Sequence, residues 1–193
     1  MDRTRQVFLL SPANCSGKRA GYLMRKGARF DLALRLRSDG ATVGEIFSFM
    51  SGLYFRGKLA YAGVFARAPL DCAGVQVIVP GRGLLPADQT ISLAELRAIA
   101  KIPVDADERR YVSPLVRDAA QLDLQLGDGD AVILLGSIAT PKYLQPLGGT
   151  LGKRLRYPAE FVGRGDMSRG SLMLRHAAQG RELTYVSAGQ TGP

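Results

Sequence analysis

The sequence has few of the residues that cross-link small proteins or bind metals. Of its 193 residues, two are cysteines and one is a histidine. Cys15 lies in a polar loop and Cys72 in a turn before an apolar segment, so we expect reduced thiols and no structural disulfide. With His176 as the single histidine, no Cys/His spacing resembles a zinc site. We therefore expect no metal and no cofactor.

Long apolar runs are also missing. No uninterrupted apolar stretch approaches the roughly 18 to 20 residues that cross a bilayer, so a membrane partner is not expected. The amino terminus reaches only the short apolar run 7–10 before Ser11 and Pro12, which is too short for the core of a secretory signal. These absences predict a cytoplasmic protein.

The composition is that of a folded chain. Hydrophobic residues make up 46% and the mean hydropathy is +0.00, which excludes a largely disordered protein. The length suits one domain that can bury a sizeable core. Because no internal repeat or linker interrupts the chain, residues 1–193 are predicted to form a single domain.

Apolar strand-like segments alternate with helical patterns. The segments 7–10, 75–79 and 131–135 each end in a turn of small or polar residues. Helices are predicted over 18–26, 30–36, 54–68, 92–99 and 114–124, and antiparallel strands over 171–175 and 182–187. This alternation predicts an α/β fold with a mixed, largely parallel sheet flanked by helices.

The loop after the first predicted strand is the strongest candidate site. It is not a Walker P-loop, because Pro12 replaces the first glycine and Arg19 replaces the hydroxyl residue after Lys18. A general anion-binding loop remains, in which Lys18 and a helix N-terminus would lower the pKa of Cys15 and make it a nucleophile. The alternative is a small apolar cysteine in a tight turn. The candidate ligand-binding side chains of this loop are Ser11, Asn14, Ser16, Lys18 and Arg19.

Four later segments carry further candidates. Residues 51–61 interleave aromatic rings with cations, a mixture that suits base stacking and phosphate contact. The alternative, which is the commoner role of such rings, is core packing that leaves the cations on the surface. Residues 80–84 and 136–143 follow predicted strands, and 163–170 is rich in glycine and charge. Asp166 is assigned proton transfer there, with a salt-bridged loop as the alternative. The candidate ligand-binding residues of these segments are Arg56, Lys58, Arg82, Ser137, Lys142, Arg164 and Arg169.

The chain is strongly basic. Lys and Arg number 26 against 17 Asp and Glu, which gives a net charge of +9 and a pI near 9.9. Such an excess favours polyanions, and nucleic acid is the leading partner. A basic but merely solvated surface is the alternative.

In the order of its segments the chain resembles the YaaA-type superfamily. The resemblance rests on Cys15-Ser-Gly-Lys18, on Ser51-Gly-Leu-Tyr-Phe-Arg-Gly-Lys58 and on Pro80-Gly-Arg-Gly-Leu84, and it spans about residues 7–147. It implies a mixed α/β fold with a basic cleft that meets DNA or RNA, as in peroxide-stress proteins and in relatives that modify 7-deazaguanine bases. In a modifying enzyme of this kind Cys15 would add to an electrophilic carbon of a base, Lys18 would stabilise the anion and Asp166 would move a proton.

Three functions follow as hypotheses. The leading one is a nucleic-acid-directed protein, in its enzymatic form a nucleobase-modifying enzyme that uses Cys15. The rivals are a non-catalytic DNA- or RNA-binding stress protein, and an enzyme that acts on a free nucleotide or phosphorylated metabolite. The repeated pattern of a strand followed by a polar loop predicts that Cys15, Arg82 and Ser137 lie in one concave region at the same edge of the sheet.

Overall fold

The computed structural model describes residues 4–188, which fold around one six-stranded sheet. The strand order is β4-β3-β1-β6-β7-β8, with a separate pair β2-β5. The strands are β1 (Gln6–Leu10), β2 (Ala41–Thr42), β3 (Val75–Val79), β4 (Gly83–Pro86), β5 (Thr90–Ile91), β6 (Ala131–Leu135), β7 (Leu155–Pro158) and β8 (Tyr185–Ser187).

Most of the sheet is parallel. β1 pairs in parallel with both β3 and β6, and β7 continues the parallel run beside β6. The two outer strands, β4 and β8, are antiparallel to their neighbours. This is the mixed, largely parallel sheet that the sequence predicts, and the three predicted strands coincide with β1, β3 and β6 to within one residue.

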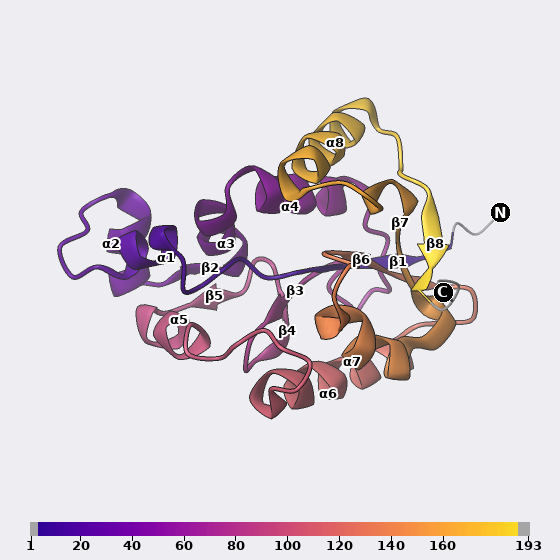
Figure 1. Ribbon diagram of the computed structural model, residues 1–193, viewed down its shortest axis with the longest axis horizontal. Coiled ribbons are helices and arrows are strands. Elements are labelled where there is room, and N and C mark those ends of the chain that lie inside the picture. Colours follow the sequence, from indigo (N-terminus) through magenta and orange to yellow (C-terminus); the bar gives the residue numbers. More distant parts are fainter. Residues whose placement is uncertain (1–3, 189–193) are drawn as a thin grey trace.

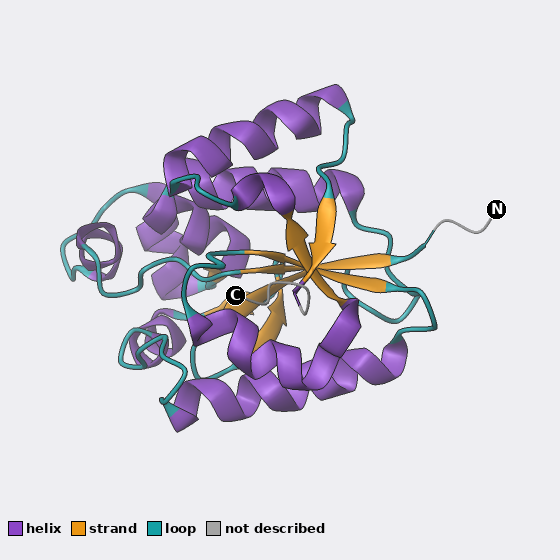
Figure 2. Ribbon diagram, turned by 45° about the vertical axis from the view of Figure 1, so that its right-hand side comes forward, coloured by secondary structure: helices purple, strands orange, loops and turns teal. Residues whose placement is uncertain are grey.

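Helices cover both faces of the sheet (Figure 2). α4 and α8 lie on one face and α6 and α7 on the other, while α1, α2, α3 and α5 gather beyond the ends of the strands (Figure 1). The helices are α1 (Lys18–Met24), α2 (Asp31–Ser38), α3 (Val43–Ser51), α4 (Leu53–Phe65), α5 (Leu93–Ile99), α6 (Arg109–Gln125), α7 (Pro141–Leu151) and α8 (Asp166–Gln179), with short 3-10 turns at Gly152–Arg154 and Ala159–Phe161.

The core has two halves, one on each side of the sheet. In β1, Phe8 and Leu10 pack into the half that includes α4 and α8, whereas Val7 and Leu9 pack into the half that includes α6 and α7. All five residues of β1 are buried, because a central parallel strand has helices over both faces. That is why residues 7–10 of β1 read as an unbroken apolar run rather than an alternating one.

The last third of the chain differs from the sequence prediction. Residues 171–175, expected to be a strand, belong to helix α8, and only 185–187 of the second expected strand pair with the sheet. Gly170 lies inside α8 and does not break it. Gly170 sits where α8 crosses α4, and a Cβ built on Gly57 of α4 would lie 2.6 Å from the Gly170 carbonyl oxygen. The glycines allow close helix packing.

Within residues 4–188, no helix is both long enough and apolar enough to span a bilayer. The same described residues contain no group of three or more His, Cys, Asp and Glu side chains placed to hold a metal ion.

Candidate functional site

A cleft of about 620 Å³ opens at the carboxyl ends of β1, β3 and β6. β1 lies between β3 and β6, so the connections from the central strands leave toward opposite sides and a crevice forms where they diverge. Its walls come from the loops after the three strands, from the 100–104 segment after α5, and from the first residues of α4, α7 and α8. The lining side chains include both hydroxyl and apolar groups, as in many small-molecule and nucleotide sites.

The cleft gathers half of the side chains proposed from the sequence. Asn14, with its neighbours in the first loop, and Ser137, in the loop after β6, both line it. The prediction that these loops converge is therefore confirmed for Cys15 and Ser137. The predicted residues that line the cleft are Ser11, Asn14, Cys15, Ser16, Ser137, Lys142 and Asp166.

Arg82 departs from that prediction. Its loop reaches the cleft through Pro80, but Arg82 itself is not among the lining residues. Its guanidinium donates to Glu95 Oε1 at 2.7 Å instead, and Glu95 is also the N3 residue of the capping box of α5. Arg82 thus joins the β3–β4 turn to a helix end.

Six further candidates also lie away from the cleft lining. Lys18 is exposed at the first residue of α1, and Arg56 is exposed on α4. Arg19 donates to the Phe49 carbonyl at 3.1 Å, and Arg164 donates to Ser168 Oγ at 3.2 Å. The remaining two, Lys58 and Arg169, are buried; Lys58 donates to Ser11 and Arg169 to the Phe161 carbonyl.

The first loop is shaped by its own hydrogen bonds. Asn14 Oδ1 accepts from the backbone N–H of Ser16 at 3.0 Å and from Ser16 Oγ at 2.8 Å, which closes a tight turn before α1. This turn carries Cys15 inward rather than toward the cations of α1. Burial raises the pKa of Cys15 to about 12, and its thiol donates to the Ala13 carbonyl at 3.5 Å. The expected lowering of this pKa is wrong, because desolvation outweighs the distant charges.

Lys58 is the most unusual group of the site. Its side chain is fully buried and reaches from α4 to the end of β1, where Nζ lies 2.6 Å from the Ser11 carbonyl oxygen and 2.9 Å from Ser11 Oγ. Nζ also lies over the rings of Tyr54 and Phe55, at 4.4 and 4.8 Å from their centroids. Burial lowers the pKa of Lys58 to about 7, an effect that the carboxylate of Asp166 partly opposes.

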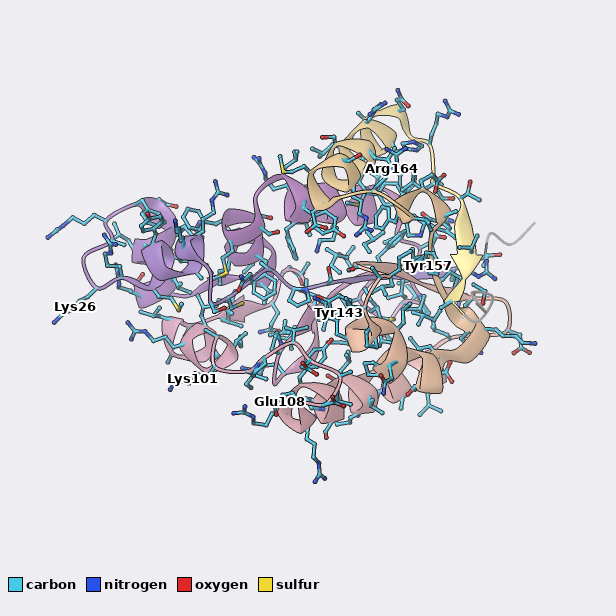
Figure 3. The ribbon with its side chains drawn as sticks, in the orientation of Figure 1. Lys26, Lys101, Glu108, Tyr143, Tyr157 and Arg164 are labelled. Carbon is cyan, nitrogen blue, oxygen red and sulfur yellow. The ribbon has the colours of Figure 1, made fainter. Side chains whose placement is uncertain are left out.

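Two tyrosines complete the floor. The Tyr54 hydroxyl is buried, and the Arg169 guanidinium lies near it without forming a hydrogen bond of normal geometry. Tyr143, seen near the centre of the molecule in Figure 3, interacts through its phenol with Ser11. Burial raises the pKa of both phenols, that of Tyr54 to about 12. Both hydroxyls thus stay protonated and can donate to a ligand.

The sequence contains a signal for part of this arrangement. Tyr54, Lys58, Tyr61 and Phe65 recur at helical spacing of four, three and four residues, and all four side chains are buried. A lysine inside such an apolar stripe must find polar partners in the protein, whereas the sequence analysis assigns Lys58 to ligand binding. The 100–104 wall gave no comparable signal.

Exposed basic charge gathers beside the cleft, in addition to Lys101 and Lys142 on its walls. The segment 18–30, covering α1 and the turn to α2, is called the basic lobe here, and its cations Lys18, Arg19, Arg25, Lys26 and Arg29 are all exposed. Figure 3 shows Lys26 at the outer end of this lobe and Lys101 on the neighbouring α5 side. α5 packs against the lobe, where Arg97 donates to the Met24 carbonyl at 3.3 Å.

Aromatic rings lie among these cations. Tyr22 is 51% exposed with the Arg25 guanidinium 5.4 Å from its ring centroid, and Phe30 is 38% exposed and stacked on Phe49 at 5.1 Å. The lobe follows the cleft loop directly, since Ser16 lines the cleft and α1 begins at Lys18. The lobe thus begins two residues after the cleft lining.

Comparison of the chain with family models, with curated proteins and with solved structures found no match. The resemblance to the YaaA-type superfamily therefore stays a prediction.

Proposed function

We propose that the protein binds nucleic acid, with the strand crossing the basic lobe and one nucleotide entering the cleft. The observation that carries this proposal is the mixture of exposed rings and cations on the lobe, with Tyr22 and Phe30 among five exposed cations. Bases stack on exposed aromatic rings while neighbouring cations follow the phosphates. The same mixture suits single strands better than duplex, because only unpaired bases offer their faces to side chains.

The cleft supports the same proposal. Lys101 and Lys142 supply positive charge at its walls, and Asp166 supplies one carboxylate. Pro80, Ile102 and Val104 provide an apolar wall against which a base can pack. A basic cleft that meets nucleic acid is also what the resemblance to the YaaA-type superfamily implies.

Salt-dependent binding tests this proposal. We expect a fluorescent single-stranded DNA or RNA of about 20 nucleotides to bind in anisotropy titrations, with affinity falling steeply from 50 to 200 mM salt because counterions are released from the phosphates. Exchanging Arg25, Lys26 and Arg29 together for glutamine should reduce the log-log salt slope by about 2, at roughly 0.7 per lost phosphate contact on a single strand.

The matched control changes the same charge elsewhere. Lys153, Arg175 and Arg181 are exposed in the turn after α7, on α8 and just beyond α8, and these elements lie away from α1 in Figure 1. Exchanging the three for glutamine also lowers the net charge from +9 to +6. This control should leave the slope almost unchanged. Equal losses in the two triple variants would show that net charge alone attracts the strand, and failure of wild-type protein to bind at 50 mM salt would refute the proposal.

A further inference from the structure

Ser11 and Lys58 are paired in a way that a purely binding cleft does not require. A fully buried lysine ends 2.9 Å from a serine hydroxyl at the floor of the cleft, and no carboxylate pairs with Lys58 Nζ among the described ion pairs. Its hydrogen-bond partners are the hydroxyl and carbonyl of Ser11. A buried amine is costly as an ammonium ion, so this site favours the neutral form that can accept a proton.

The position of Ser11 is fixed by its neighbours. Its backbone N–H donates to the Leu135 carbonyl at 3.1 Å, which ties the end of β1 to the end of β6. Gly136 is the next residue after Leu135, and a Cβ built on it would lie 2.9 Å from Ser11 Cβ and 3.3 Å from Ser11 Oγ. A hydroxyl held this tightly beside an amine has the geometry of a nucleophile next to its base.

We infer that Ser11 and Lys58 form a nucleophile–base pair that cleaves a carboxylic ester or amide held in the cleft. This activity goes beyond the proposed binding of nucleic acid and does not depend on it. Serine–lysine pairs perform this chemistry on unrelated folds, which makes geometry rather than fold the basis of the assignment.

The reaction balances with water as the second substrate. Ser11 Oγ forms a bond to the carbonyl carbon while its proton passes to Lys58 Nζ, and the carbonyl electron pair moves onto the oxygen. The tetrahedral intermediate collapses, the bond to the leaving group breaks, and the leaving group takes the proton from Lys58. Water then attacks the acyl-serine, Lys58 accepts and returns a proton, and the carboxylic acid departs.

Tyr54 is placed to assist this step. Its hydroxyl is buried at the cleft floor and has no hydrogen-bond partner of normal geometry within the described part of the chain. A protonated phenol in such a position can donate to the oxyanion of the intermediate. The positive charge of the nearby Arg169 guanidinium stabilises negative charge that develops beside the Tyr54 hydroxyl.

Active-site labelling with diisopropyl fluorophosphate, read by intact-protein and peptide mass spectrometry, tests the pair. We expect one adduct, located on Ser11. Ser11→Ala should lose it, and Lys58→Met should slow labelling by about 100-fold or more while circular dichroism shows a folded protein, since a general base contributes roughly that factor. Ser171→Ala and Lys153→Met change exposed residues outside the cleft and should label at the wild-type rate.

A pH profile separates a base from a structural lysine. Labelling of the wild type should rise about tenfold per pH unit up to pH 7 and then level, and Lys58→Met should lose this profile. The titratable and charged groups near Lys58 are Tyr54 and Arg169 on the α4–α8 side, Tyr143 of α7 and the carboxylate of Asp166. The phenols, with raised pKa values, cannot produce a rise near pH 7.

Release of p-nitrophenol from p-nitrophenyl acetate is the second measurement, because this small ester needs little room. Wild-type turnover that disappears in Ser11→Ala supports the pair. Absence of both labelling and turnover in the wild type, an adduct on another residue, or an unchanged rate in Lys58→Met would overturn it. Each of these results leaves the anisotropy measurements of nucleic-acid binding unaffected, so the two proposals can fail separately.

Discussion

At the scale of single residues, Cys15 and Lys58 both have a different environment from the one that the sequence suggests. Cys15 stands next to a basic segment and looks like an activated thiol, yet the Asn14 turn carries it into an apolar environment. Lys58 looks like a surface cation, yet it is buried against Ser11. Sequence distance to a charge says little about solvation, and solvation decides both pKa values.

The thiol prediction is direct. Because burial raises the pKa of Cys15 to about 12, only about one molecule in ten thousand carries the thiolate at pH 8. We expect iodoacetamide to alkylate Cys72, which is half-buried, faster than Cys15 at that pH. Peptide mass spectrometry of partially alkylated native protein measures both rates. Faster reaction at Cys15 would restore the thiolate hypothesis.

Lys58 also gives the folding stability a distinct pH dependence. Its pKa falls from 10.5 to about 7 on folding, so between pH 7 and 9 the unfolded chain binds a proton that the folded chain does not. Stability of the wild type should therefore rise with pH across this window, by at most about 1.4 kcal/mol per unit, and below pH 7 the folded state bears the full cost of the buried ammonium. Above pH 9 the raised pKa of Cys15 acts in the opposite direction.

Urea unfolding at pH 7, 8 and 9 measures this contribution. Lys58→Met should abolish the rise, and Lys153→Met, which alters an exposed side chain, should keep it. If Lys58→Met keeps the wild-type slope of unfolding free energy against pH, another group takes up the proton on unfolding.

At the scale of elements, the contact between α4 and α8 determines the position of Lys58. Gly57 and Gly170 face each other where the two helices meet, and a Cβ on Gly170 would lie 2.9 Å from the Leu53 carbonyl oxygen. Backbone therefore packs against backbone, one residue before the lysine. Few side-chain rearrangements could relieve an added methyl group there.

We expect Gly57→Ala to destabilise the protein by about 1–3 kcal/mol, the usual cost of overpacking. Gly63 lies on the same helix with no atom within 4 Å of its built Cβ, so Gly63→Ala should be neutral or stabilising by up to ~1 kcal/mol. Chemical denaturation of the two variants decides the matter. Similar losses in both would mean that helix propensity, not the crossing, controls the effect.

The same elements show what the sequence could predict. Short, mostly apolar segments located β1, β3 and β6, and the Ser92–Glu95 capping box located the start of α5, because each signal is local. The α8 helix was predicted as loop and strand, since Gly165 and Gly170 read as breakers until a partner helix is known. The 100–104 wall and the burial of Lys58 likewise depend on contacts between distant segments.

At the scale of the whole molecule, the fold separates two properties. The sheet edge provides the enclosed cleft with its hydroxyl groups, and the basic lobe beyond it provides exposed rings and charge. Convergence of the loops could be predicted, because parallel strands end at one edge. The position of the basic surface could not be predicted, because the net charge is a sum over the whole sequence and only the fold determines where the cations lie.

Stacking and charge on the lobe should be separable. Tyr22→Ala removes an exposed ring without changing a charge, so it should weaken single-stranded DNA or RNA binding by about 1–3 kcal/mol while leaving the salt slope intact. Anisotropy titrations at two salt concentrations provide both quantities. Tyr22→Ala with unaltered affinity would mean that bases do not stack at this position.

The central place of β1 also bears on the order in which the chain can fold. Phe8 pairs with Val75 on one side and with Ile133 on the other, so the first strand gains its partners only after residues far along the chain have been made. Such distant pairings close large loops and form slowly compared with local helices. Ser11, at the end of β1, therefore precedes both partner strands along the chain and is fixed only once they are available. A chain interrupted before β6 holds every atom of the Ser11–Lys58 pair but lacks the strand that fixes it.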